Sequence, residues 1–330
     1  MFSTPQFWHD ENDCPLLARN FGFVDKQNLE EIVTRVESWS DLCTGFQDIT
    51  LKADQYDLCK DEQFLRIFRK DAERTYVPKH DPEQQKRTLE RHDKHIHILR
   101  TVVSEVNDYH QGMGYIAAFL GLFLEAESVS KFMLALHRET KYSKGYFSAT
   151  PQRFVADAHV LNRIIAQRRP ALHAHLAKHG VLPEMYATKW FVGLGLHVLP
   201  YSSLFDFYEL FFQHGYAYLF RFGIAYVEKF ETELLAAKDT SGIMTILRAE
   251  DPRCDWKPPA DMIARHEKDD IFGNIVKDAV DIDLGVDLEA LREEEGIRVA
   301  EAVERARKRD QELKEMYSDD EIVFSDEEDD

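Results

Sequence analysis

Apolar residues recur at helical spacing along most of the chain. Between residues 81 and 108 they fall on one face of a helix, and Asp81 and Pro82 supply its cap and first-turn proline. A turn at Asn107 and Asp108 leads into residues 112–124, which are apolar on all sides. A helix with no polar face is typical of the buried middle of a large all-α domain.

Turn residues divide the next part of the chain into further helices. We predict them at residues 155–169, 171–178, 186–199, 202–213 and 216–237. The last three carry an aromatic stripe that we assign to the core rather than to a ligand site: Trp190, Phe191, Phe205, Phe207, Phe211, Phe212, Phe220 and Phe222. Strand-like alternation is almost absent, and no repeat of long period is present. The patterns predict an all-α fold.

The composition changes after residue 237. Prolines break the chain at residues 251–252 and 257–259, and residues 287–316 read as a charged helix whose sparse apolar positions sustain no heptad seam. A solvated helix is therefore expected. We predict four parts: a helical lead-in (1–47), the main domain (48–240), a C-terminal helical extension (241–316) and a disordered acidic tail (317–330).

Charge and cysteine usage limit the classes of function. The net charge of −19 argues against a nucleic-acid partner, because a phosphate backbone requires a cationic surface. The 4 cysteines form no CxxC pair and the N-terminus lacks a basic start, so a reduced, cytoplasmic protein is expected. The longest apolar run, residues 112–124, is shorter than the roughly 18 residues of a membrane span.

Two short segments carry candidate chemistry. The first holds Phe68, Asp71, Arg74, Thr75 and Pro78, and the second holds Tyr109, Gln111, Gly112 and Met113. They resemble two signatures of the TBC-domain (Tre-2/Bub2/Cdc16) family of Rab GTPase-activating proteins, Ile-x-x-Asp-x-x-Arg and Tyr-x-Gln-Gly, with Phe in place of Ile. A third signature of that family, Tyr-x-x-x-Trp-Phe, is similar to residues 186–191 and follows in the same order. The resemblance covers about residues 48–237.

The resemblance implies a two-lobed multi-helix domain and a site shared with a partner. Arg74 and Gln111 would emerge from neighbouring loops and enter the GTP site of a GTP-bound Rab-family GTPase, in vesicle trafficking. Asp71 would orient Arg74 or its loop, Tyr109 would pack beneath the glutamine loop, and Gly112 would let the backbone approach the partner. GTP and Mg²⁺ would belong to the GTPase, so no cofactor or metal is expected on this chain. Recruitment to endomembranes would follow from the partner.

The residue types suit this chemistry. GTP hydrolysis needs an aligned water and extra stabilisation of the charge on the transferring phosphoryl group. A guanidinium is always charged and donates two parallel hydrogen bonds, so lysine at Arg74 is expected to be a poor substitute. The amide of Gln111 donates and accepts at once and suits the positioning of a water. Taken singly, Arg74 also reads as a surface arginine paired with Asp71 or Glu73, and Gln111 as an ordinary first-turn helix residue.

A second hypothesis is a non-catalytic TBC-fold module that docks on a Rab-type GTPase or a trafficking complex. Departures from the usual family residues favour it: Asp108 for Gly, Gly114 for Asn, Tyr208 for Trp and Glu209 for Asp. The retention of both Arg74 and Gln111 favours catalysis, because a docking module has no chemical need for the pair. Under the catalytic hypothesis the protein is an activator of the GTPase and turns over no substrate of its own.

Other features stay open. His92, His95 and His97 lie close in sequence, but only the first two share a helix face, so a zinc site is disfavoured. The basic segment 66–94 is either a solvated face or a surface complementary to an acidic GTPase. Ser318 and Ser325 precede acidic residues and fit either phosphorylation or a merely solubilising tail.

Overall fold

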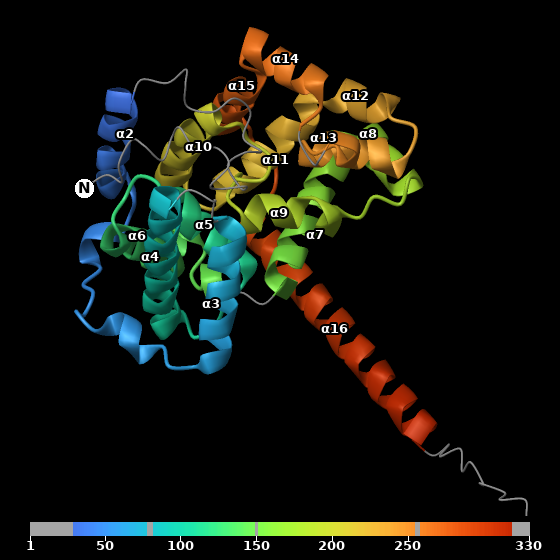
Figure 1. Ribbon diagram of the computed structural model, residues 1–330. Coiled ribbons are helices and arrows are strands. Elements are labelled where there is room, and N and C mark those ends of the chain that lie inside the picture. Colours follow the sequence, from blue (N-terminus) through green and yellow to red (C-terminus); the bar gives the residue numbers. More distant parts are fainter. Residues whose placement is uncertain (1–28, 78–81, 149–150, 255–257, 319–330) are drawn as a thin grey trace, which may run out of the picture.

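A computed structural model describes residues 29–77, 82–148, 151–254 and 258–318 (Figure 1). The predicted N-terminal cap Asp81, the motif residue Pro78, most of the lead-in and the tail with Ser325 lie outside these ranges. The α-helices are α2 (Leu29–Leu42), α3 (Glu62–Thr75), α4 (Pro82–Val106), α5 (Gln111–Leu120), α6 (Ala126–Arg138), α7 (Pro151–Arg168), α8 (Pro170–Lys178), α9 (Ala187–Val192), α10 (Tyr201–His214), α11 (Ala217–Lys229), α12 (Glu231–Ala236), α13 (Thr240–Arg248), α14 (Ala260–Asp269), α15 (Ile271–Asp278) and α16 (Leu288–Ser318).

Short 3-10 helices join several of them. They are η4 (Phe46–Asp48), η5 (Gln55–Leu58), η6 (Thr140–Tyr142), η7 (Tyr146–Ser148), η8 (Pro183–Met185), η9 (Pro252–Cys254) and η10 (Ala279–Asp281). The described ranges contain helices and no strand, which confirms the all-α prediction. None of the described helices combines the length and the apolar character that a membrane crossing requires.

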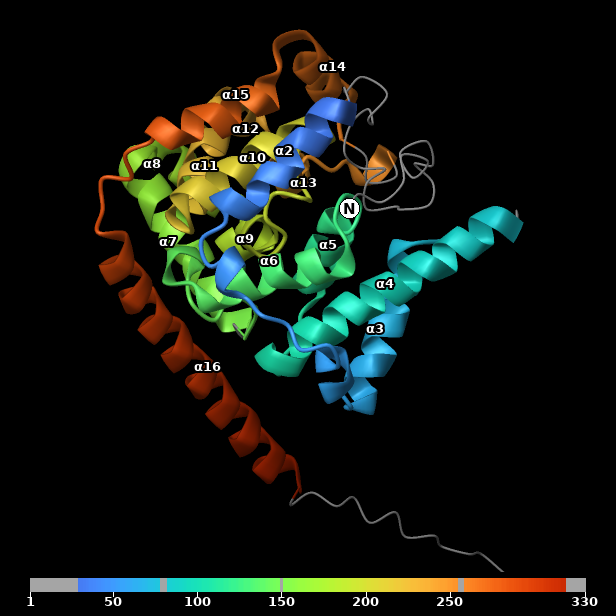
Figure 2. The ribbon, with the colours of Figure 1, turned by 90° about the vertical axis from the view of Figure 1, so that its left-hand side faces the viewer.

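The helices form two groups. Figure 1 shows α3 to α6 on one side of the molecule and α7, α8, α12 and α13 on the other. Helix α10 packs against α2, α11 and α15, and α7 packs against α8, α9, α11 and α16. In both Figure 1 and Figure 2, α16 runs away from the rest of the molecule.

One continuous aromatic core joins the two groups. Every residue of the predicted aromatic stripe is at most 3% exposed, which confirms its assignment to the core. Trp39 of α2 is completely buried and stacks on Tyr208 of α10 with ring centroids 5.8 Å apart. The departure Glu209 accepts hydrogen bonds from Arg35 (2.8 Å) and from the Trp39 indole (3.2 Å). Residues 208–209 therefore serve the packing of α2.

Two predicted helices are wrong in their extent. The helix expected over 186–199 ends at Val192, because Leu194 and Gly195 adopt the left-handed region with φ of 45° and 75°. The helix expected over 216–237 is divided at the buried Phe230 into α11 and α12. The predicted turn after α4 is confirmed, since Asn107 ends that helix with a left-handed φ of 53°.

Helix α16 has an anchored part and an exposed part. Leu291 and Glu295 in its first turns are 8% and 2% exposed, and Arg292 pairs with Asp157 of α7 at 2.7 Å. Residues 300–313 are all exposed. The predicted solvated helix is therefore confirmed for the second part, whereas the first part belongs to the folded body.

Candidate active site

Arg74 lies in the last turn of α3. The helix begins at the cap residue Asp61, whose carboxylate accepts a hydrogen bond from the backbone N–H of Gln63 at 2.8 Å. One turn before its end, Asp71 accepts a hydrogen bond from the Arg74 guanidinium. The two side chains differ sharply in exposure, with 65% for Arg74 and 5% for Asp71. Arg74 thus projects from a helix end rather than from a loop, on a buried carboxylate support.

Asp71 also holds the second segment. Its other carboxylate oxygen, Oδ2, accepts a hydrogen bond from the Tyr109 hydroxyl. The Tyr109 ring packs edge-on against Phe68 of α3, with ring centroids 5.2 Å apart. Burial raises the pKa of Asp71 to about 6. Asp71 is therefore placed to orient Arg74, and Tyr109 packs on α3 in the turn that leads to Gln111.

The residues after Arg74 are also fixed. Thr75, the last residue of α3, is buried, and the N–H of Tyr76 donates to the Ala72 carbonyl at 2.9 Å. The Tyr76 carbonyl accepts from Nε2 of His92 on α4 at 2.7 Å. The backbone that follows the arginine is therefore tied to α4.

Gln111 is the first residue of α5 and is exposed. It follows Tyr109 by two residues, and the N–H of Tyr109 is held by the Asp108 carboxylate at 2.7 Å. The α5 N-terminus carries the positive end of the helix dipole, which favours anions such as phosphate. The structure therefore places Gln111 at a helix start rather than in a loop.

Gly112 makes a close approach inside the chain. A Cβ on this residue would lie 2.2 Å from Cγ1 and 2.6 Å from the carbonyl oxygen of Val192, at the end of α9. The glycine therefore lets α5 touch α9, which is a different reason from the expected approach to a partner. The carbonyl of the preceding residue, Phe191, accepts a hydrogen bond from the Tyr146 hydroxyl. The residue directly after the third signature, Val192, thus contacts the helix that carries Gln111.

Sequence reasoning did not find that two histidines beside these residues are buried, and it considered His95 only as a disfavoured zinc ligand. His110, the residue before Gln111, packs on Phe147 and Phe154 with centroid distances of 6.0 and 5.6 Å. His95 of α4 is 1% exposed. Burial lowers the pKa of both to about 4, so both are neutral at pH 7. Only the burial of these polar side chains next to a motif would have singled them out. Burial cannot be read from one sequence.

The three neighbouring histidines have separate surroundings. His92 binds the Tyr76 carbonyl, His97 packs on the Tyr56 ring at 4.5 Å, and His95 lies in the core. Within the ranges that the structure describes, no group of three or more His, Cys, Asp or Glu side chains is arranged to hold a metal ion.

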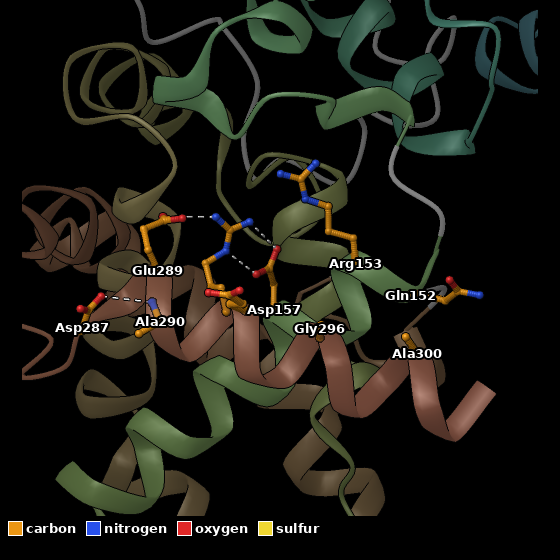
Figure 3. A pocket seen from close by; sticks show the side chains of 11 residues that line it. Gln152, Arg153, Asp157, Asp287, Glu289, Ala290, Gly296 and Ala300 are labelled. Atoms are coloured by element: carbon orange, nitrogen blue, oxygen red, sulfur yellow. Dashed lines mark hydrogen bonds and ion pairs between the residues drawn. The ribbon is translucent and has the colours of Figure 1, made fainter. Parts of the chain in front are cut away.

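A pocket of about 630 Å³ lies elsewhere, between α7 and α16 (Figure 3). Its two arginines are bound by neighbouring side chains. Arg292 pairs with Asp157 at 2.7 Å and with Glu289 at 3.4 Å, and Arg153 donates to the Ser143 hydroxyl. None of the motif residues lines it. We therefore locate the candidate site at Arg74 and Gln111.

Comparison with known proteins gives concordant matches. The family model described as the Rab-GTPase-TBC domain matches residues 45–235. TBC domain-containing protein C4G8.04 of Schizosaccharomyces pombe is 29% identical over 139 residues, which is 42% of this chain and 18% of that protein. TBC1 domain family member 10A of Mus musculus is 30% identical over 116 residues, which is 35% of this chain and 23% of that protein. The chain thus spans less than two thirds of these relatives.

A solved structure has the same fold. The crystal structure of the Chlamydomonas flagellar RabGAP TBC domain superimposes with a TM-score of 0.56 at 17% identity, covering 78% of this chain and 86% of the other. This likeness establishes the two-lobed helical architecture.

Proposed function

Because the chain belongs to the Rab-GTPase-TBC domain family, we propose that it accelerates GTP hydrolysis on a GTP-bound Rab-family GTPase. Arg74 and Gln111 supply the two catalytic side chains. The observation that carries the proposal is the Asp71 carboxylate, which binds Arg74 through one oxygen and Tyr109, two residues before Gln111, through the other. A single buried group thereby joins the two segments that hold the candidate residues.

Arg74 has the exposure and the support that an arginine finger needs. Its side chain is 65% exposed, so it can reach a partner, while its support Asp71 stays buried. Inserted beside the transferring phosphoryl group, the guanidinium stabilises the charge of the transition state, and such fingers are worth roughly 10³ to 10⁵ in rate. Arg66, Arg69 and Lys70 of α3 are also exposed and would face an acidic GTPase surface.

Gln111 takes the second role. Its exposed amide sits at the first residue of α5, where the helix dipole adds positive potential toward the phosphates. The amide oxygen accepts a hydrogen bond from the attacking water and the amide N–H donates to a phosphoryl oxygen. The proton released from the water passes to the phosphate product, so no residue of this chain has to act as a base.

The nucleotide and its metal belong to the partner in this scheme. Mg²⁺ held by the GTPase neutralises charge on the β- and γ-phosphates. This chain binds neither GTP nor Mg²⁺ by itself and needs no cofactor. We place the activity in the cytoplasm, in vesicle trafficking, with recruitment to endomembranes through the membrane-bound Rab.

Single-turnover GTP hydrolysis by a panel of Rab-family GTPases tests the proposal. We expect the chain to accelerate at least one member, Arg74→Ala to lower that acceleration by about 10³, and Gln111→Ala to lower it strongly as well. Arg305→Ala, which removes a 67% exposed arginine of α16 outside the motif segments, is the matched control and should retain activity. GTP-dependent binding without acceleration of any member would replace catalysis by the docking-module hypothesis.

A further inference from the structure

His95 lies beneath the candidate site and has no part in the proposed reaction. Its side chain is 1% exposed, and its ring meets the Tyr76 ring edge-on at 5.8 Å. Neither ring nitrogen has a hydrogen-bond partner within the described ranges. Buried polar atoms are nearly always paired, because an unpaired one loses its hydration without compensation. The two ring nitrogens of His95 are therefore expected to have a polar partner.

The polar neighbours lie around Gly114. A Cβ on this glycine would be 3.1 Å from the Tyr109 hydroxyl, 3.6 Å from Oδ2 of Asp71 and 3.7 Å from Nε2 of His95. Three parts of the fold, α3, α4 and the turn before α5, thus direct polar atoms toward one point. Glycine leaves no side chain there to separate them.

The donors and acceptors of this group are complementary. Asp71 accepts from Arg74 and from Tyr109. The Tyr109 oxygen, having donated its proton, keeps lone pairs that accept. His95 is neutral at pH 7, so it offers one N–H donor and does not compete with Arg74 as a second cation beside the carboxylate.

We propose that His95 is a positioning residue: its Nε2–H donates to one bound water that in turn donates to the Tyr109 hydroxyl, which completes a relay through Asp71 to Arg74. The inference rests on the proposed function, because Arg74 is the group that the relay positions. Hydrogen bonds in a chain polarise one another, so the donor at one end strengthens the hold on the guanidinium at the other.

Carboxyl NMR titration of Asp71 in the free protein tests the relay without a GTPase. We compare wild type with His95→Phe, which keeps a ring and removes the donor, and with His95→Gln, which keeps a donor. His97→Phe, two residues along α4 and against Tyr56, is the control. His95→Phe should raise the pKa of Asp71 by about half a unit or more, since the carboxylate loses support. His95→Gln should largely restore it, and an unchanged pKa in a folded His95→Phe protein would overturn the inference.

The second measurement is single-turnover hydrolysis in a double-mutant cycle. His95→Phe should lower kcat about 5- to 10-fold at unchanged affinity for the GTPase, and should have no further effect in Arg74→Ala. An equal loss in the Arg74→Ala background would contradict a role through Arg74. If wild type accelerates no GTPase, the proposed function fails, and the carboxyl titration alone decides whether His95 supports Asp71.

Discussion

The Tyr109 hydroxyl donates a hydrogen bond to Oδ2 of Asp71, 38 residues earlier in the chain. The same carboxylate binds Arg74 through Oδ1, one helical turn along α3. The two motif segments are therefore joined by a side-chain network as well as by helix packing. A substitution at Tyr109 is therefore expected to affect the position of Arg74 through Asp71 rather than through a direct contact.

We expect Tyr109→Phe to separate activity from binding. The ring still packs on Phe68, but Asp71 loses a charge-assisted hydrogen bond, which costs about 1 to 3 kcal/mol of the free energy of unfolding. Arg74 is then held less well, so kcat should fall about tenfold, while affinity for the GTPase stays the same. Urea unfolding and single-turnover hydrolysis measure the two effects. Tyr56→Phe, which keeps a ring against His97, is the control and should be silent in both.

The pH dependence of activation should reflect Asp71. Its pKa is raised to about 6 by burial, against an ordinary value of about 3.9. As the pH falls through 6 the carboxylate takes up a proton and its attraction for Arg74 is lost, so activation should decline. For stability the sign is opposite, because the folded state binds this proton more tightly than the unfolded state and acidification favours folding at this residue.

The ratio of activated to intrinsic hydrolysis, measured from pH 7.5 to 5, removes the titration of the GTPase itself. In Asp71→Asn the ratio should be low and flat over this range. A decline that persists unchanged in Asp71→Asn would assign the pH dependence to another group.

A methyl group at Gly112 tests whether the close contact between α5 and α9 positions Gln111. Gly112→Ala places a methyl group 2.2 Å from Cγ1 and 2.6 Å from the carbonyl oxygen of Val192, so α5 must move away from α9. We expect a loss of about 1 to 3 kcal/mol in the free energy of unfolding and a lower kcat as Gln111 is displaced. Gly296→Ala in α16 is the control, since its methyl meets nothing within 4 Å. It should stabilise the helix by about 0.5 to 1 kcal/mol.

Helix positions and motif residues were predictable from the sequence because they depend on local patterns. The periodicity between residues 81 and 108 and the turn at Asn107 correspond closely to α4 and its end. The extent of α9 was not predictable: Leu194 is a good helix former, yet it adopts a left-handed conformation where α9 meets α5. Tertiary packing decides such positions.

The site was predictable only as a set of residue types. The spacing of Asp71 and Arg74 is one helical turn, so their pairing follows from the sequence, and the family resemblance singles out Gln111. The contact of Tyr109 with Asp71, the contact of Gly112 with Val192 and the burial of His95 join residues distant in the chain. No periodicity encodes these contacts, because each depends on how whole helices cross.

The anchor of α16 gives a prediction independent of the candidate site. Arg292, 13% exposed, pairs with the 2% exposed Asp157 at 2.7 Å, and the Tyr216 hydroxyl donates to the same carboxylate at 2.7 Å. Arg292→Met leaves the buried Asp157 carboxylate without its cation and with the neutral Tyr216 hydroxyl as its donor. We therefore expect the free energy of unfolding to fall by about 3 to 5 kcal/mol. Activity per folded molecule should not change, because the motif residues lie elsewhere.

The matched control for Arg292→Met is Arg305→Met in the exposed part of α16. Arg305 is 67% exposed and pairs with Glu301 at 3.6 Å, and an exposed pair of this kind contributes under about 0.5 kcal/mol. Adding Asp157→Asn to Arg292→Met should recover part of the loss, since the unpaired charge is removed. Equal unfolding midpoints for Arg292→Met and Arg305→Met would mean that α16 is not held by the Arg292–Asp157 pair.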